Sequence, residues 1–225
     1  MAIVSATNIH KTYASGDLAV RALRGVDIEV QQGEMVAIMG PSGCGKTTLL
    51  NCLSGLDNVN DGNISIGGKA IHELTDDEIS EFRAKFMGFV FQTYNLLPVL
   101  TAQENVELPL LVSGVSTKIA AKKAQEQLEL VGLLDRANHR PAELSGGQQQ
   151  RVAVARSLVN TPEIIWADEP TGNLDSQNEQ EIMDLICDMN KQHKQTFVLV
   201  THSETVGART NRIIRMSDGL IASDS

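Results

Sequence analysis

Aromatic residues, cysteines, positive charge and long apolar runs are all scarce in this chain of 225 residues. The cysteines are Cys44, Cys52 and Cys187, too few for a disulfide framework or a zinc site, which favours a reducing, cytoplasmic setting. No apolar run approaches the roughly 18 residues that a membrane span needs, and residues 1–5 begin no secretory signal. The net charge of −9 argues against a general affinity for nucleic-acid backbone, so no nucleic-acid partner is expected.

Short apolar runs carry the fold signal. They fall at residues 35–39, 89–91, 164–167 and 197–200. Each run is nearly continuously apolar, as expected for strands buried on both faces of a parallel sheet. The apolar spacing over residues 182–189 is typical of one helix face, and Ser176 with Glu179 predicts a capping box that opens this helix. Strands alternating with helices predict an α/β fold with crossover connections.

Two regions depart from this alternation. The first 30 residues and residues 61–68 have turn-and-strand patterns, which predict a small antiparallel sheet with turns at Gly16-Asp17 and Arg24-Gly25. Residues 93–157 contain no clear strand and predict a helical lobe inserted between sheet strands. We therefore expect one domain over residues 1–225 that contains this lobe.

A glycine-rich loop follows the first apolar run. It reads Gly40-Pro41-Ser42-Gly43-Cys44-Gly45-Lys46-Thr47 and matches the pattern G-x-x-x-x-G-K-[ST]. Glycine lets consecutive backbone N–H groups converge on phosphate oxygens, and the following helix adds its N-terminal partial positive charge. Lys46 can reach the β- and γ-phosphates, and Thr47 offers a hydroxyl to Mg²⁺. The loop predicts a nucleoside-triphosphate site.

Two carboxylates end the apolar run at 164–167. An acidic residue at the carboxyl end of a strand beside a phosphate loop is placed to hold Mg²⁺, which makes Asp168 the metal candidate. Glu169 then stands where a general base can polarise an attacking water. Without the phosphate loop, such a pair would indicate only a surface turn.

Leu144-Ser145-Gly146-Gly147-Gln148 is a second glycine-rich helix start. It offers free N–H groups and a hydroxyl, which suit an anion, although a plain helix cap would use the same residues. A single nucleotide bound to one subunit has no evident use for two anion-binding helix N-termini. They are explained if two copies pair head to tail, each supplying half of each site.

Three further side chains are site candidates. His202 and Gln92 follow two of the predicted strands at the sheet edge where ligands collect, so His202 could contact the γ-phosphate and Gln92 the Mg²⁺ or the water. Tyr13 could stack on a purine ring or simply pack against its neighbours.

Together these residues resemble the ATP-binding subunit of ABC transporters over essentially the whole chain and in the family's order. In that resemblance Tyr13 is the adenine-stacking aromatic, residues 40–47 are the Walker A loop and Gln92 is the Q-loop residue. The resemblance implies contacts from the Walker A residues and Thr48 to ATP, with Thr47 and Gln92 on Mg²⁺.

The second half of the chain completes the resemblance. Residues 144–148 match the signature motif, the most specific feature, because other P-loop families lack it. Asp168 and Glu169 end the Walker B strand, Asp175 belongs to the D-loop and His202 matches the switch histidine. The implied nucleotide contacts of this half are Ser145, Gly146, Gly147, Gln148 and Asp175. The implied catalytic residues are Glu169, His202, Gln92 and Lys46.

The family fold implies a RecA-like P-loop core with a parallel sheet, a small antiparallel β-lobe and an inserted helical lobe. The resemblance also implies an ATP-sandwiched homodimer and transmembrane permease partners at the cytoplasmic face of the inner membrane, contacted through a groove near Gln92. Residues 89–98 and 104–110 look like the branch that serves macrolide export, lipoprotein release and cell division. Residues 94–97 would then lie at the membrane partner, unless Leu96 and Leu97 are core of the helical lobe.

The resulting expectation is an ATPase subunit that energises export or lipoprotein release. One alternative is a cell-division type ABC ATPase that signals across the membrane. A second is an ABC ATPase without a transport role, acting on DNA or the ribosome, which the acidic charge disfavours. A P-loop kinase would have no reason for the motif at residues 144–148.

Overall fold

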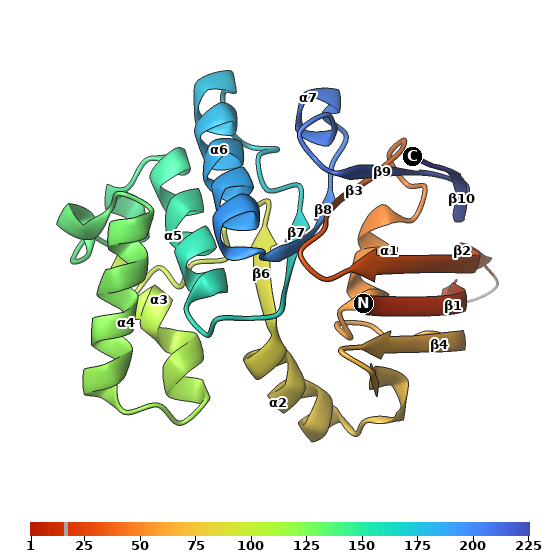
Figure 1. Ribbon diagram of the computed structural model, residues 1–225, viewed down its shortest axis with the longest axis horizontal. Helices are drawn as coiled ribbons and strands as arrows, with labels where there is room; N and C mark the ends of the chain where they lie inside the picture. Colours follow the sequence, from red (N-terminus) through yellow and green to blue (C-terminus); the bar gives the residue numbers. More distant parts are fainter. Residues whose placement is uncertain (16–17) are drawn as a thin grey trace.

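The computed structural model describes residues 1–15 and 18–225 and is built around a six-stranded sheet (Figure 1). The strand order is β10-β9-β3-β8-β7-β6, and β10 is antiparallel to β9 while the other neighbours are parallel. The strands are β3 (Met35–Met39), β6 (Met87–Phe91), β7 (Ile164–Asp168), β8 (Thr196–Val200), β9 (Arg212–Ser217) and β10 (Leu220–Asp224). The four apolar runs are confirmed as parallel strands.

Helices cover the sheet because alternate side chains of its strands are apolar on both faces. They are α1 (Lys46–Leu53), α2 (Asp76–Phe86), α3 (Ala102–Val112), α4 (Thr117–Leu130), α5 (Gly146–Leu158), α6 (Ser176–His193) and α7 (Glu204–Gly207). On one face Ile38 and Trp166 share a core with α1 and the small sheet, and on the other Phe197 and Leu199 share a core with α5 and α6. These two cores fix the carboxyl ends of the central strands, where the site residues lie.

A four-stranded sheet of order β2-β1-β4-β5 lies beside α1 (Figure 1). Its strands are antiparallel, as predicted, and are β1 (Ala2–Ser15), β2 (Leu18–Gln31), β4 (Asp61–Ile66) and β5 (Lys69–Ala70). The turn predicted at Gly16-Asp17 lies outside the described residues. The turn predicted at Arg24-Gly25 is wrong, because both residues lie inside β2. Gly25 has φ 98° and falls at a register shift in the pairing of β2 with β1, so the glycine marks a bulge rather than a turn.

The segment from Thr93 to Ser157 contains α3, α4 and most of α5, which lie together at one end of the molecule (Figure 1). These helices share a third core to which α4 contributes Ala120, Ala124 and Leu128. The structure assigns no strand to this segment, in agreement with the sequence pattern. In the described part of the chain, no helix has the length and apolar character that a membrane crossing requires.

Candidate functional site

The glycine-rich loop connects β3 to α1 and is enclosed by the backbone of other strands. Gly40 has φ 149°, and a Cβ there would stand 2.2 Å from the carbonyl oxygen of Met216. Gly45 has φ 105°, and its Cβ would stand 2.5 Å from the carbonyl oxygen of Ala22. Both distances are far below van der Waals contact, so only glycine fits this path.

Lys46 opens α1 and points back into the loop. Its side chain is buried, and Nζ donates to the carbonyl oxygens of Gly40 at 2.8 Å and Pro41 at 3.0 Å. An ammonium group held inside a ring of backbone groups at a helix N-terminus adds positive charge where phosphate oxygens bind. The local geometry is that of an anion cradle.

The loop and the end of β7 meet through one hydrogen bond. Thr47 Oγ1 donates to Asp168 Oδ1 at 3.1 Å, which joins the hydroxyl and the carboxylate predicted to hold Mg²⁺. Burial raises the pKa of Asp168 and the neighbouring Glu169 charge adds to this, while the Thr47 hydrogen bond and Lys46 oppose it. Oxygen donors of this kind suit Mg²⁺. The described residues contain no cluster of three or more His, Cys, Asp or Glu side chains able to hold a metal.

Glu169 and His202 lie together at the carboxyl ends of β7 and β8. Glu169 Oε1 is 2.9 Å from His202 Nδ1, and the glutamate side chain is mostly buried while that of His202 is 70% exposed. Glu169 takes a left-handed backbone with φ 46°, and its N–H donates to Val200 O at 2.9 Å. Strain of this kind in a residue with a side chain is common at active sites. Glu169 thereby lines the same cavity as Lys46 and Thr47 of the loop.

Gln92 follows β6 at the same edge of the sheet, one residue past the Phe91–Asp168 pair. Its Nε2 donates to Asn173 Oδ1 at 3.3 Å, and Asn173 Nδ2 donates to the carbonyl oxygen of Gln92 at 2.9 Å. Among the described residues, its side-chain hydrogen bond goes to Asn173 and not to Thr47 or Asp168. The structure thus joins Gln92 to the segment after Glu169, and its metal role stays a prediction.

One cavity of about 480 Å³ brings Tyr13 together with most of the predicted residues of the glycine-rich loop. Tyr13, from β1, is 42% exposed and lines it opposite the loop. The other predicted residues along its wall are Ser42, Gly43, Gly45, Lys46, Thr47, Thr48 and Glu169. Cys44 is buried behind the loop, where its carbonyl oxygen accepts from Gly219 N at 3.0 Å.

The second glycine-rich helix start lies at the beginning of α5, apart from α1 in the fold (Figure 1). Ser145 caps α5 in a capping box with Gln148: Ser145 Oγ accepts from Gln148 N at 3.3 Å, and Gln148 Oε1 accepts from Ser145 N at 3.0 Å. A Cβ on Gly147 would stand 2.0 Å from Asn178 Oδ1, and Gly146 faces the Tyr94 hydroxyl. No residue from 144 to 148 is among the described residues that line the nucleotide cavity, so one chain keeps the two helix starts apart.

Asp175 is the N-cap of α6, and this corrects the predicted capping box. Asp175 Oδ1 accepts from Asn178 N at 2.9 Å. Ser176 is therefore the first residue of the helix and not its cap. Glu179 does not close a box with Ser176 but accepts from Thr171 Oγ1 at 3.2 Å. Both Asp175 and Ser176 have side chains that can cap a helix, and the path of the backbone into the helix selects Asp175 as the cap.

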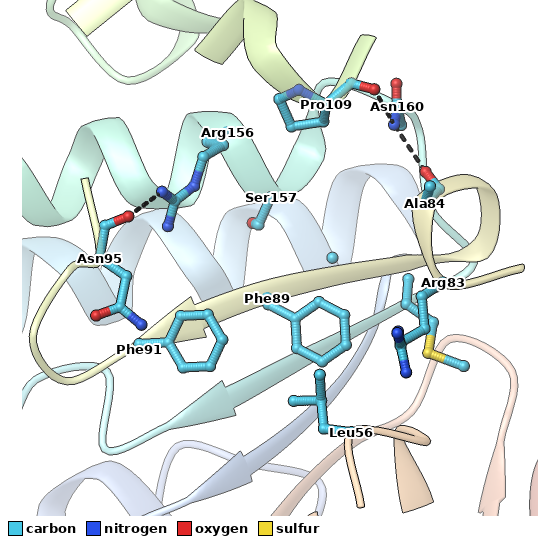
Figure 2. Close-up of a pocket in the computed structure, with 12 residues that line it drawn as sticks. Leu56, Arg83, Ala84, Phe89, Phe91, Asn95, Pro109, Arg156, Ser157 and Asn160 are labelled. Atoms are coloured by element: carbon cyan, nitrogen blue, oxygen red, sulfur yellow. Dashed lines mark hydrogen bonds between the residues drawn. The ribbon is translucent and has the colours of Figure 1, made fainter. Parts of the chain in front are cut away.

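A second, more apolar cavity of about 370 Å³ lies between β6, α2 and α5 (Figure 2). Phe89 and Phe91 project into it side by side, their ring centroids 6.0 Å apart, with Leu56 opposite Phe89. Arg156 donates to the carbonyl oxygens of Tyr94 at 2.8 Å and Asn95 at 2.5 Å. These two hydrogen bonds hold the segment after Gln92 along the cavity wall. Of the two leucines left open by the sequence, Leu96 packs on the helical core and Leu97 is 44% exposed.

One group of residues beside Tyr13, at the Tyr13 end of the nucleotide cavity, was not predicted from the sequence. Lys11 and Asp57 both contact Tyr13, and both lie outside every recognised motif. No local pattern could have found the pair, because Asp57 is 44 residues from Tyr13 in the chain.

The strand β3, the glycine-rich loop and α1, with a carboxylate at the end of β7 on the far side of β8, define a P-loop nucleoside triphosphatase. Residues 23–172 match the family model described as ABC transporter, and the chain belongs to that family. It is an ATP-binding cassette and an ATPase.

Relatives and solved structures agree with this assignment. The chain is 50% identical over 203 residues to "Lipoprotein-releasing system ATP-binding protein LolD" of Bacteroides fragilis, which covers 90% of this chain and 94% of the relative. It is 46% identical over 222 residues to "Macrolide export ATP-binding/permease protein MacB" of Bdellovibrio bacteriovorus, covering 99% of this chain but 34% of that longer protein. The ATP-binding cassette MJ0796, solved as a dimer in a post-hydrolysis state bound to ADP and Pi, superposes with a TM-score of 0.92 at 44% identity, covering 99% of this chain and 97% of that one.

Proposed function

We propose that this chain is the ATP-hydrolysing subunit of a membrane complex that exports a substrate or releases lipoproteins. The carrying observation is the arrangement of Lys46, Thr47 and Glu169 around one cavity, with Asp168 hydrogen-bonded to Thr47. Residues 1–225 act as one ATPase domain in which residues 93–157 are the inserted helical lobe.

Nucleotide binding uses both ends of the cavity. The loop N–H groups and Lys46 hold the phosphates, Thr48 supports them from α1, and Tyr13 stacks on the base. Thr47 and Asp168 hold Mg²⁺ with the phosphate oxygens, and Gln92 approaches the metal from β6. When bound, the ion neutralises charge on the β- and γ-phosphates.

Hydrolysis uses the pair at the ends of β7 and β8. Glu169 accepts a proton from the attacking water, and its contact with His202 at 2.9 Å orients the carboxylate. His202 also donates to the transferring phosphoryl group, and Lys46 balances the charge that accumulates on it. The left-handed backbone at Glu169 supports this assignment, because it holds the carboxylate toward the loop.

A second copy completes each site. Ser145, Gly146 and Gly147 are not among the described residues that line the cavity of their own chain, and their hydroxyl and N–H groups serve the γ-phosphate held by a partner. Gln148 secures that helix start through its capping box, and Asp175 lies nearby at the start of α6, bonded to Asn178. The dimeric state of the related cassette structures supports this arrangement.

The apolar cavity beside β6 is the docking site for a transmembrane permease subunit (Figure 2). Its wall includes Asn95, close in sequence to Gln92, so a partner seated there can sense the nucleotide. A chain docked in this way lies at the cytoplasmic face of the inner membrane and is held there by protein contacts. The strong similarity to LolD and MacB favours lipoprotein release or export over the cell-division alternative.

A pull-down from detergent-solubilised membranes of the native source tests this function. The bait is the Glu169→Gln variant with Mg·ATP, which should retain the ATP-bound dimer. We expect an integral membrane protein with few spans and a large outer domain, identified by mass spectrometry. Recovery of ribosomal or DNA-associated proteins instead would contradict the transporter assignment.

A further inference from the structure

The base end of the nucleotide cavity contains a three-residue cluster that links Tyr13 to the phosphate-binding helix. The Tyr13 hydroxyl donates to Asp57 Oδ2 at 2.6 Å. Lys11 Nζ donates to Asp57 Oδ1 at 2.6 Å and to Asn58 O at 2.5 Å. Lys11 itself is buried, with 8% of its surface exposed. The carboxylate of Asp57 therefore accepts one hydrogen bond on each oxygen from side chains of the same strand, β1.

The same cluster is tied to α1. Asp57 lies in the turn that follows this helix, where its N–H donates to Asn51 O at 3.1 Å. Thr48, two residues after the loop lysine Lys46, also lies close to the Tyr13 phenol. The small sheet and α1 meet here, so the distance between the phosphate loop and the Tyr13 ring depends on these contacts.

The cluster also decides which face of the Tyr13 ring is free. Lys11 Nζ lies over the ring, 5.0 Å from its centroid, so one face is occupied by the ammonium group. The ring nevertheless lines the nucleotide cavity and is 42% exposed. A tyrosine has two side-chain torsions, and a fixed hydroxyl at its tip together with a cation over one face leaves it one orientation.

We propose that Asp57 is a positioning residue of the nucleotide site, which together with Lys11 holds the Tyr13 ring in the orientation that stacks on the purine base. The proposal rests on the proposed binding of ATP in this cavity. Asp57 touches neither phosphate nor metal in this account and acts through Tyr13. Burial and the hydrogen bond to Asp57 raise the pKa of Tyr13, so the phenol remains a neutral donor at physiological pH.

Comparing ADP with pyrophosphate separates the base from the phosphates. Asp57→Ala and Tyr13→Phe should each raise the Kd of Mg·ADP by about three- to tenfold, the cost of ordering one aromatic side chain on binding. The Kd of Mg·pyrophosphate should stay unchanged, because the loop is intact. Asp57→Asn keeps an acceptor for the phenol and should restore most of the ADP affinity. The measurement is isothermal titration calorimetry on the full chain.

The double variant Tyr13→Phe/Asp57→Ala tests whether the two residues act as one unit. Its Kd for ADP should match that of the single variants, since both changes remove the same hydrogen bond. Asp61→Ala is the matched control, because its carboxylate contacts only the N–H of Gly62 among the described residues. This control should bind both ligands as the wild type does.

Three results would overturn the proposal. They are additive losses in the double variant, equal weakening of ADP and pyrophosphate, or an unchanged ADP affinity in Asp57→Ala. These outcomes leave the proposed function intact as long as the wild-type chain binds ADP. If the wild-type chain binds neither ADP nor ATP, the proposed function itself is contradicted.

Discussion

Replacing Glu169 with glutamine should lower ATP turnover by at least about 100-fold, the usual contribution of a positioned general base. Glutamine has nearly the same shape but cannot accept the proton of the attacking water. ATP affinity should not change, because Lys46, Thr47 and Asp168 are untouched. Phosphate release under saturating ATP measures turnover, and binding of a fluorescent ATP analogue measures affinity.

A glutamate at the other end of the same strand provides the control for this experiment. Glu163 precedes β7, is exposed and bonds Gln32 at 3.3 Å, far from the loop. Glu163→Gln should hydrolyse ATP at the wild-type rate. Unchanged turnover in Glu169→Gln would show that another group activates the water.

Replacing Gly147 with alanine should lower turnover by about 10²- to 10³-fold, the cost of losing donors aimed at a transition-state oxyanion. The added Cβ would stand 2.0 Å from Asn178 Oδ1, so either the Asn178 side chain or the start of α5 must shift. ATP binding to the individual chain should persist, because Gly147 does not line the cavity of its own chain. Turnover and nucleotide affinity, measured as for Glu169, separate the two effects.

Mixing two inactive variants shows whether the loss arises across a dimer. A Lys46→Ala chain paired with a Gly147→Ala chain has one composite site with both defects and one with neither. An equal mixture should therefore recover turnover toward about one quarter of the wild-type value, given random pairing of a symmetric dimer. A mixture no more active than its separate components would contradict a shared site.

The parts of the site that follow from local sequence were predictable. Residues 35–39 and 164–167 are apolar in unbroken runs, and the loop from Gly40 to Thr47 has a pattern with one chemical use. Each feature spans only a few consecutive residues, so interactions between residues close in sequence determine its structure. These elements were placed correctly, and the parallel register then brought Thr47 to within 3.1 Å of Asp168.

The features that depend on distant contacts were not predictable. Gly25 reads as a turn from its neighbours, yet pairing with β1 makes it a bulge within β2. Asp175 and Ser176 are equally good N-cap residues by residue type, and the path of the preceding turn selects Asp175. The contact between Tyr13 and Asp57 depends on how the small sheet packs beside α1, which no single segment encodes.

Two copies of this chain are expected to close around ATP, each completing the site of the other. Analytical ultracentrifugation of the Glu169→Gln variant, with saturating Mg·ATP and then with Mg·ADP, measures this pairing. We expect a dimer with ATP that carries two nucleotides, and a monomer with ADP. A monomer at saturating ATP, with nucleotide bound, would rule out the shared site.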